Sequence, residues 1–182
     1  RGDLTLHMAA HLVRQSPLLP EMIPYEEMER WRRVYASPNV RTDFAKLFLD
    51  GVAPGFTASF TEPYLAASGY DGETHDADGI LLLTPEAVAH EITELDRRGF
   101  TVKMHAVGDN AIRRGLDGIE AARRANGFSG LRHEIAHAPF VRTEDLSRFS
   151  ALDAVAEVSP KLWYPNPATQ AQIALLGEHR VS

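Results

Sequence analysis

The sequence predicts an α/β fold with a parallel sheet, because short apolar runs typical of strands alternate along the chain with helical patterns. About five strands are expected, with a helix or crossover between most of them. Apolar residues make up 44% of the 182 residues, enough for a continuous core. A closed (β/α)8 barrel needs roughly 250 residues, so this length fits about five-eighths of one. A doubly wound sheet fits the same pattern.

Each predicted element has a local signal. Strands are expected where apolar residues recur, at residues 4–8, 43–50, 100–105, 131–137 and 154–158. The apolar stripe of residues 24–36 predicts a first helix. Thr84 followed by Pro85 is a typical start for a second helix. Asp109 and Thr143 are expected to cap the two helices that follow.

The domain organisation follows from the ends of the chain and from one long connection. Residues 52–80 are rich in Gly, Ala and aromatic residues and too long for an ordinary connection, so we expect a lid or substrate loop there. The chain opens on Arg1 and stops within a helical pattern. Residues 1–182 are therefore interpreted as a fragment, about strands three to seven, of a single catalytic barrel domain.

Composition excludes several functional classes. The chain has 19 basic and 25 acidic residues, and its net charge of −6 argues against a nucleic-acid or membrane-surface partner. The absence of cysteine excludes disulfides, Cys-ligated zinc and thiol nucleophiles. No run reaches about 18 consecutive apolar residues and no signal-peptide pattern opens the chain, so a cytoplasmic location is expected.

Lys46 is unusual because it lies in an apolar strand, on the same face as Phe44 and Phe48. A buried ammonium is costly unless it is neutralised or paired. In the structural interpretation, its head group reaches water at the strand end or pairs with Asp50. In the chemical interpretation, the amine is neutral and nucleophilic. Such an amine takes up carbon dioxide to form a carbamate, whose oxygens bind metals.

Histidines mark two further strands. His105 ends a predicted strand, and the carboxyl ends of parallel strands carry the chemistry in such folds; a purely structural histidine is the alternative. Residues 133–137 match the H-E-x-x-H pattern of zinc metallopeptidases, which requires a helix. Glycines before this pattern and Pro139 after it favour a strand instead. On a strand, His133 and His137 are expected to share one face, with His137 at the rim and His133 deeper in the barrel.

Three segments together resemble the amidohydrolase superfamily, specifically amidohydrolase family 3, the YtcJ-like branch that includes N-substituted formamide deformylases. The segments are AKLFLDG at 45–51, KMHAVGDNAI at 103–112 and LRHEIAHA at 131–138. Their order and separations are also similar to those of the family, and the resemblance covers nearly the whole chain.

The resemblance implies a distorted TIM barrel that holds one or two divalent metal ions, usually zinc, at the carboxyl ends of its strands. It implies that Lys46 is the bridging ligand from strand four, carboxylated in many members. It also implies that His105 and His137 are the histidine ligands from strands five and six. The family's His-x-His pair on strand one and its strand-eight aspartate, the usual proton shuttle, have no counterpart in this sequence.

The activity implied by the resemblance is hydrolysis of a non-peptide C–N bond in a small-molecule amide or formamide. Trp163 and Tyr164, which follow the last predicted strand, and His133 are expected to contact this substrate. Two alternatives stay open: a zinc metallopeptidase centred on His133, Glu134 and His137, and a non-enzymatic α/β binding domain. We also expect the isolated chain to bind metal weakly, to hydrolyse nothing and to self-associate into a homo-oligomer through unpaired strand edges.

Overall fold

A computed structural model of the chain describes residues 5–70, 79–162 and 166–181. These residues form one parallel sheet, which confirms the predicted α/β class. Its strands are β1 (Met8–Val13), β2 (Val40–Phe48), β3 (Thr101–Ala106), β4 (Glu134–His137) and β5 (Val155–Val158). The strand order β1-β2-β3-β4-β5 is consecutive and has no reversal, so the sheet is not doubly wound. This order is consistent with a segment of a (β/α)8 barrel.

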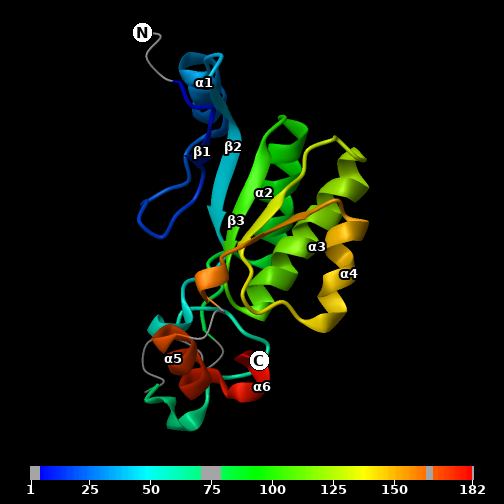
Figure 1. Cartoon of the computed structure of the whole chain (residues 1–182). Coiled ribbons are helices and arrows are strands. Elements are labelled where there is room, and N and C mark those ends of the chain that lie inside the picture. Colours follow the sequence, from blue (N-terminus) through cyan, green and yellow to red (C-terminus); the bar gives the residue numbers. More distant parts are fainter. Residues whose placement is uncertain (1–4, 71–78, 163–165, 182) are drawn as a thin grey trace.

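Helices connect the strands and cover one side of the sheet. They are α1 (Tyr25–Tyr35), α2 (Pro85–Arg97), α3 (Asp109–Asn126) and α4 (Thr143–Ala151), followed by α5 (Pro167–Leu176) and α6 (Glu178–Val181). Helices α2, α3 and α4 lie side by side along the sheet, whereas α5 and α6 gather at one end of it near the C-terminus (Figure 1). No helix among the described residues combines the length and apolar character that crossing a membrane requires.

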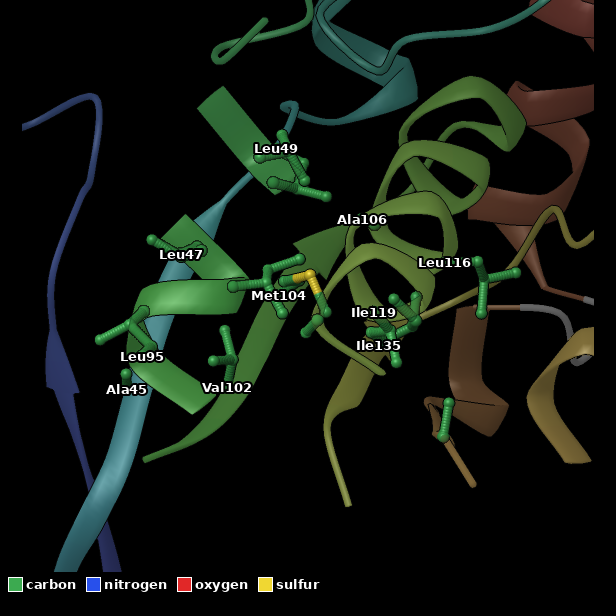
Figure 2. Packing of buried hydrophobic residues seen from close by; sticks show 14 of the residues in the cluster. Ala45, Leu47, Leu49, Leu95, Val102, Met104, Ala106, Leu116, Ile119 and Ile135 are labelled. Atoms are coloured by element: carbon green, nitrogen blue, oxygen red, sulfur yellow. The ribbon is translucent and has the colours of Figure 1, made fainter. Parts of the chain in front are cut away.

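The main core lies between the sheet and helices α2 and α3 (Figure 2). Every second residue of the central strands contributes to it, including Ala45, Leu47, Leu49, Val102, Met104, Ala106 and Ile135. Gly115 lets α3 approach the sheet, because a Cβ there would lie 2.6 Å from Cδ1 of Ile135. The residues between these face the other side of the sheet. This alternation leaves one apolar face under the helices and one face that carries polar groups.

The first strand begins later than predicted. β1 covers Met8–Val13 rather than residues 4–8. Met8 pairs with Val40, the first residue of β2, so the described residues before it, 5–7, have no neighbouring strand to bond to. The side chain of Leu6 is accordingly 68% exposed. The other four strands are found where they were predicted, with shifted boundaries.

Of the three N-cap residues predicted from the sequence, the structure confirms one. Thr84 caps α2, its hydroxyl accepting the N–H of Ala87 at 3.2 Å. The predicted cap at Asp109 is wrong: Gly108 holds that position, and the Asp109 carboxylate accepts the N–H and O–H of Thr61 instead. At α4 the cap position belongs to the residue before Thr143 and has no side-chain hydrogen bond. At Asp109, the contact with Thr61 outside the helix takes the carboxylate that would otherwise cap α3.

The long connection after β2 packs against the C-terminal helices. Its described part, residues 52–70 and 79–80, contains two short 3-10 helices, Ala53–Gly55 and Ala66–Ser68. A second, smaller core joins it to α5 and to the ends of β3 and β4; its members are Ala53, Ala58, Phe60, Tyr64, Val107, Phe140 and Leu176. This connection therefore lies at the carboxyl ends of the strands.

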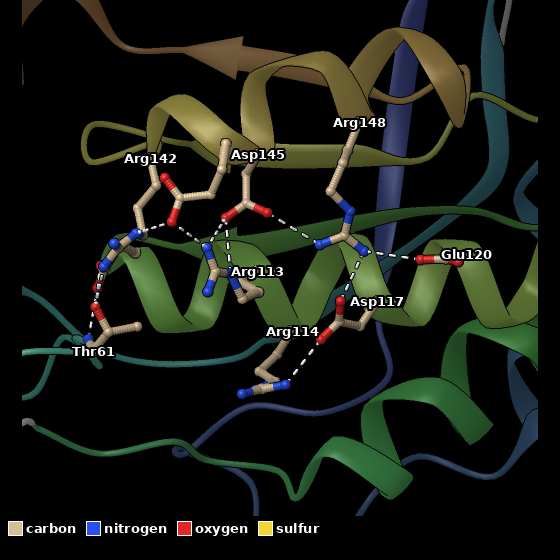
Figure 3. Close-up of polar contacts among 10 residues, drawn as sticks. Thr61, Arg113, Arg114, Asp117, Glu120, Arg142, Asp145 and Arg148 are labelled. Carbon is tan, nitrogen blue, oxygen red and sulfur yellow. Dashed lines mark hydrogen bonds and ion pairs between the residues drawn. The ribbon is translucent and has the colours of Figure 1, made fainter.

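An ion-pair network fastens α4 to α3 (Figure 3). Asp145 of α4 is 3% exposed and accepts hydrogen bonds from Arg113 at 2.9 Å and from Arg148 at 3.2 Å. Arg148 also donates to Asp117 of α3 at 2.7 Å. The buried carboxylate thus links Arg113 of α3 to α4 and also holds Arg148, which itself reaches α3 through Asp117.

We expect Asp145→Ala to lower the free energy of unfolding by about 2–3 kcal/mol, because it leaves two partly buried arginines without their shared carboxylate. Urea denaturation of the variant measures this loss. Asp117→Ala is the matched control on the same network; its side chain is 40% exposed, and we expect a loss of no more than about 1 kcal/mol. Equal losses for both variants would contradict the assignment of Asp145 as the central group.

Candidate metal centre

Three adjacent strands place the residues implied as metal ligands on one face of the sheet. Lys46 lies on β2, His105 on β3 and His137 at the end of β4. The rings of His105 and His137 are in edge contact, with 4.8 Å between their centroids. Phe48 lies on the same face, with its ring centroid 5.4 Å from that of His105. The structure therefore brings the two histidines together beside Lys46.

The backbone of His137 explains how its ring reaches this face. Strict alternation along β4 would direct His137 to the same side as Ile135, which packs against α3. His137 instead has a φ of 73°, a left-handed conformation that is uncommon for residues other than glycine. Ala138 follows with a φ of 39°. This departure turns the imidazole away from the helices and toward His105.

Each of these histidines has one ring nitrogen engaged by a neighbouring oxygen. Nε2 of His105 lies 2.8 Å from the carbonyl oxygen of Gly51. A carbonyl only accepts, so Nε2 carries the proton and Nδ1 keeps its lone pair. Nδ1 of His137 lies 3.2 Å from the hydroxyl of Ser159, which leaves Nε2 as the free nitrogen of that ring. Metal-binding histidines typically have one nitrogen held in this way.

Burial lowers the pKa of both imidazoles below their ordinary value of 6.5. The positive charge of Lys46 acts in the same direction on each ring, and His137 does so on His105. Both rings are therefore neutral at pH 7. Neutral imidazole is the form that binds a metal ion.

Within the described part of the chain, no carboxylate forms an ion pair with Lys46. Burial, with the nearby charge of Lys103 as the next cause, lowers its pKa from 10.5 to about 8. Glu157, which would otherwise neutralise it, lies 2.6 Å from Nζ of Lys103. The expected alternative of a Lys46–Asp50 pair is wrong, because the Asp50 carboxylate accepts backbone N–H groups instead. At pH 7 about one tenth of the Lys46 amine is therefore neutral, far more than for an ordinary lysine.

His133 lies on the opposite face from the one predicted. It is fully buried under α2, where Nδ1 accepts the N–H of Val102 at 3.0 Å and Nε2 bonds to Asp96 at 2.9 Å. Strand alternation does link His133 with Ile135, but this face packs against the helices. A side chain enclosed and bonded in this way cannot contact a substrate. Its expected role in substrate binding is therefore corrected to a structural one.

The H-E-x-x-H interpretation fails on the same geometry. Its two histidines must lie on one face of a helix. Residues Glu134–His137 form a strand, and His133 and His137 lie on opposite faces of the sheet. Glu134 itself lies 3.9 Å from Nζ of Lys103. The zinc metallopeptidase alternative is thus excluded by the structure.

The sequence interpretation missed the groups that hold the histidines. Gly51 and Asp50 lie within the first family-like segment, yet the hydrogen bond to His105 crosses from one strand end to the next. Ser159 follows β5 and reaches His137 in the same manner. Only the pairing of neighbouring strands brings these residues together. Trp163 and Tyr164, predicted to contact substrate, lie outside the described residues.

Comparison with known proteins identifies the family. A family model described as "Amidohydrolase family" matches residues 2–182. The chain belongs to the amidohydrolase family. The predicted resemblance is therefore confirmed, and the ordered segments around Lys46, His105 and His137 were a sound basis for it.

Relatives of this amidohydrolase-family chain are longer than the chain itself. "Protein LONG AFTER FAR-RED 3" of Arabidopsis thaliana is 32% identical over 115 residues, covering 63% of this chain and 18% of that protein. "Putative amidohydrolase YtcJ" of Bacillus subtilis (strain 168) is 26% identical over 142 residues, covering 76% and 25%. The chain thus spans a quarter or less of these curated relatives.

Two solved structures share its fold. They are uncharacterized metal-dependent hydrolases from Pyrococcus furiosus and Pyrococcus horikoshii OT3, at 22% and 23% identity. Each superimposes with a TM-score of 0.70 over 98% of this chain, which corresponds to 33% and 32% of those chains. The β-α arrangement is therefore that of about one third of these larger structures.

Proposed function

We propose that this chain supplies the ligands of a metal-dependent amidohydrolase that hydrolyses C–N bonds other than peptide bonds. His105 and His137 bind one or two divalent metal ions, with zinc as the metal, and Lys46 binds as its carbamate. The substrate is a small-molecule amide, such as an N-substituted amide or formamide. Family membership and the face shared by these three residues support the proposal.

The observation that carries the proposal is the state of the two histidine rings. They touch at 4.8 Å between centroids, they are neutral, and each has its second nitrogen held by an oxygen. The carbonyl of Gly51 leaves a lone pair on Nδ1 of His105, and the Ser159 hydroxyl, which can donate or accept, leaves Nε2 of His137 available to a metal. Imidazole nitrogens in this arrangement suit zinc, which prefers nitrogen donors at catalytic centres.

Lys46 completes the proposed set, because it lies on the same face of the sheet as the two histidines. Among the described residues, no group of three or more His, Cys, Asp or Glu side chains could hold a metal ion. A catalytic zinc takes three protein ligands. The half-buried amine of Lys46, with its lowered pKa, can react with carbon dioxide and present an anionic oxygen in the third position.

Each residue then has a defined task. A divalent metal ion at this site supplies Lewis-acid activation of water and of the scissile carbonyl. Gly51 and Ser159 fix the orientation of the two imidazoles. Lys103 pairs with Glu157 and so weakens the stabilisation that this carboxylate gives to the charged form of Lys46. We assign the described part of the connection, residues 52–70 and 79–80, which packs at the strand ends, to one wall of the substrate pocket.

Metal analysis tests the proposal directly, and it is made on the intact protein, meaning a complete barrel that contains residues 1–182, because the isolated chain is expected to bind metal weakly and to hydrolyse nothing. We expect the purified protein to carry zinc in a stoichiometric amount and to lose hydrolysis of N-substituted formamides or amides when the metal is removed by a chelator. Readdition of zinc should restore the activity. A protein that binds ligand or substrate with full affinity and no metal would support the binding-domain alternative and refute the proposal.

The pH dependence of metal uptake should report on all three ligands. Both histidines have a pKa lowered by burial, so we expect metal to be retained at neutral pH and released only as the pH falls through those lowered values. Carbamate formation needs the neutral amine of Lys46, so bicarbonate should speed zinc uptake more strongly as the pH rises toward about 8. Uptake by the metal-free protein is followed at several pH values with and without bicarbonate. Lys46→Met should abolish the bicarbonate effect; an unchanged effect would exclude the carbamate.

A further inference from the structure

Asp50 lies two residues after the end of β2 and is almost fully buried at the proposed metal-binding end of the sheet, with 1% of its surface exposed. Its carboxylate accepts the N–H groups of Ser59 at 3.0 Å, Val107 at 3.0 Å and Gly108 at 2.8 Å. These donors come from the connection after β2 and from the turn between β3 and α3. One side chain thus joins three segments that surround His105.

The residue after Asp50 is the one that holds His105. The carbonyl of Gly51 accepts the proton on Nε2 of His105 at 2.8 Å. On its other side, the N–H of Gly51 donates to the carbonyl of Thr57 at 2.9 Å. A Cβ at Gly51 would lie 2.1 Å from the hydroxyl oxygen of Thr57, so glycine is required at this close approach. The direction of this carbonyl is therefore set by the contacts of Asp50 and Thr57.

The same carboxylate also fixes the end of the strand that carries His105. Val107 and Gly108 follow β3 immediately, and both donate to Asp50. Gly108 is held so close to the connection that a Cβ there would lie 1.9 Å from the carbonyl oxygen of Ser59. Both the imidazole and the oxygen that accepts its proton are thus tied to one buried group.

We propose that Asp50 is a positioning residue for the metal centre, which holds the Gly51 carbonyl against Nε2 of His105 and so keeps Nδ1 deprotonated and directed at the metal. This inference rests on the proposed function of His105 as a ligand. Asp50 touches neither metal nor substrate in this role. It acts through the tautomer and the orientation of a single imidazole.

Asp96 offers a matched control on the other face of the sheet. It is also a buried carboxylate, 2% exposed, and it accepts hydrogen bonds from Asn126, Ser129 and His133. Loss of either carboxylate should destabilise the fold, since buried N–H and O–H groups lose their acceptor. Only the loss of Asp50 should change the metal centre.

The experiment compares Asp50→Ala, Asp50→Asn and Asp96→Ala in the intact protein. Zinc dissociation constants come from competition with a chromophoric chelator. Histidine ring tautomers come from ¹⁵N NMR of the metal-free protein. For Asp50→Ala we expect zinc affinity to fall about 10- to 100-fold and His105 to lose its pure Nε2–H tautomer, while His137 is unchanged. Asp50→Asn keeps one acceptor oxygen and should recover part of both properties. Asp96→Ala should change zinc affinity less than about twofold.

Several results would overturn the inference. An Nδ1–H tautomer for His105 in the unmodified protein does so whether or not any variant folds. Equal losses of zinc affinity in Asp50→Ala and Asp96→Ala would show that both act only through stability. If the unmodified protein binds no zinc, the proposed function fails, and the His105 tautomer in Asp50→Asn still decides whether Asp50 positions the ring.

Discussion

Replacing Lys46 by alanine is expected to remove the metal and at least about 10³-fold of kcat/KM, which corresponds to about 4 kcal/mol of transition-state stabilisation. The reason is that two neutral histidines alone leave a zinc ion without its third protein ligand. Lys46 has no acidic partner among the described residues, so its loss should cost the fold little. Zinc content, kcat/KM and thermal unfolding measured on the same preparation separate these effects.

A small carboxylate should rescue this variant. Lys46→Ala opens a space on the face of the sheet that carries His105 and His137. Added formate or acetate can place an oxygen there, where the carbamate would be. Lys46→Met is the matched control, because its side chain fills that space and excludes the added anion. We expect partial return of zinc and activity for the alanine variant alone. Full metal content in Lys46→Ala without any additive would remove Lys46 from the ligand set.

His133→Ala is expected to lower the free energy of unfolding by about 3–5 kcal/mol and to leave zinc affinity unchanged. The side chain is fully buried, and its loss leaves the N–H of Val102 without its acceptor and Asp96 without one of its donors. It also opens a cavity under α2. The metal site is unaffected because His133 lies on the helix side of the sheet, away from His105 and His137.

His137→Ala should give the opposite pattern. Its ring is only half-buried and bonds to the hydroxyl of Ser159, so we expect a stability loss of no more than about 2 kcal/mol with loss of zinc. Urea denaturation and metal analysis of the two variants complete the comparison. Loss of zinc from His133→Ala in protein that remains folded would revive the H-E-x-x-H metallopeptidase and contradict the strand found for Glu134–His137.

Much of the fold could be predicted because its signals are local. The alternation of apolar runs with helical stripes predicted a parallel sheet, and Thr84 with Pro85 predicted the start of α2. The start of β1 could not be predicted in this way. It is set by where β2 begins, since Met8 is the first residue with a partner, at Val40. Strand ends depend on the neighbouring strand and not on the residues alone.

The candidate ligands could also be named in advance, while their surroundings could not. Lys46, His105 and His137 were indicated by their strand positions and by the resemblance to the family. Alternation correctly placed His133 on the same face as Ile135. It did not show that this face packs against the helices, where α2 supplies the buried carboxylate of Asp96. Alternation also failed to show that the ring of His137 reaches the face that carries His105 through a left-handed backbone conformation.

The order of the motifs along the chain determined the family, the fold class and the three candidate ligands. Those features depend on residue identity and spacing, which are properties of the chain before it folds. The tertiary structure alone decided which ring nitrogens are free, which lysine pairs with Glu157 and which histidine is structural. These depend on hydrogen bonds between residues that lie far apart in sequence, so they exist only after neighbouring strands and helices have packed together.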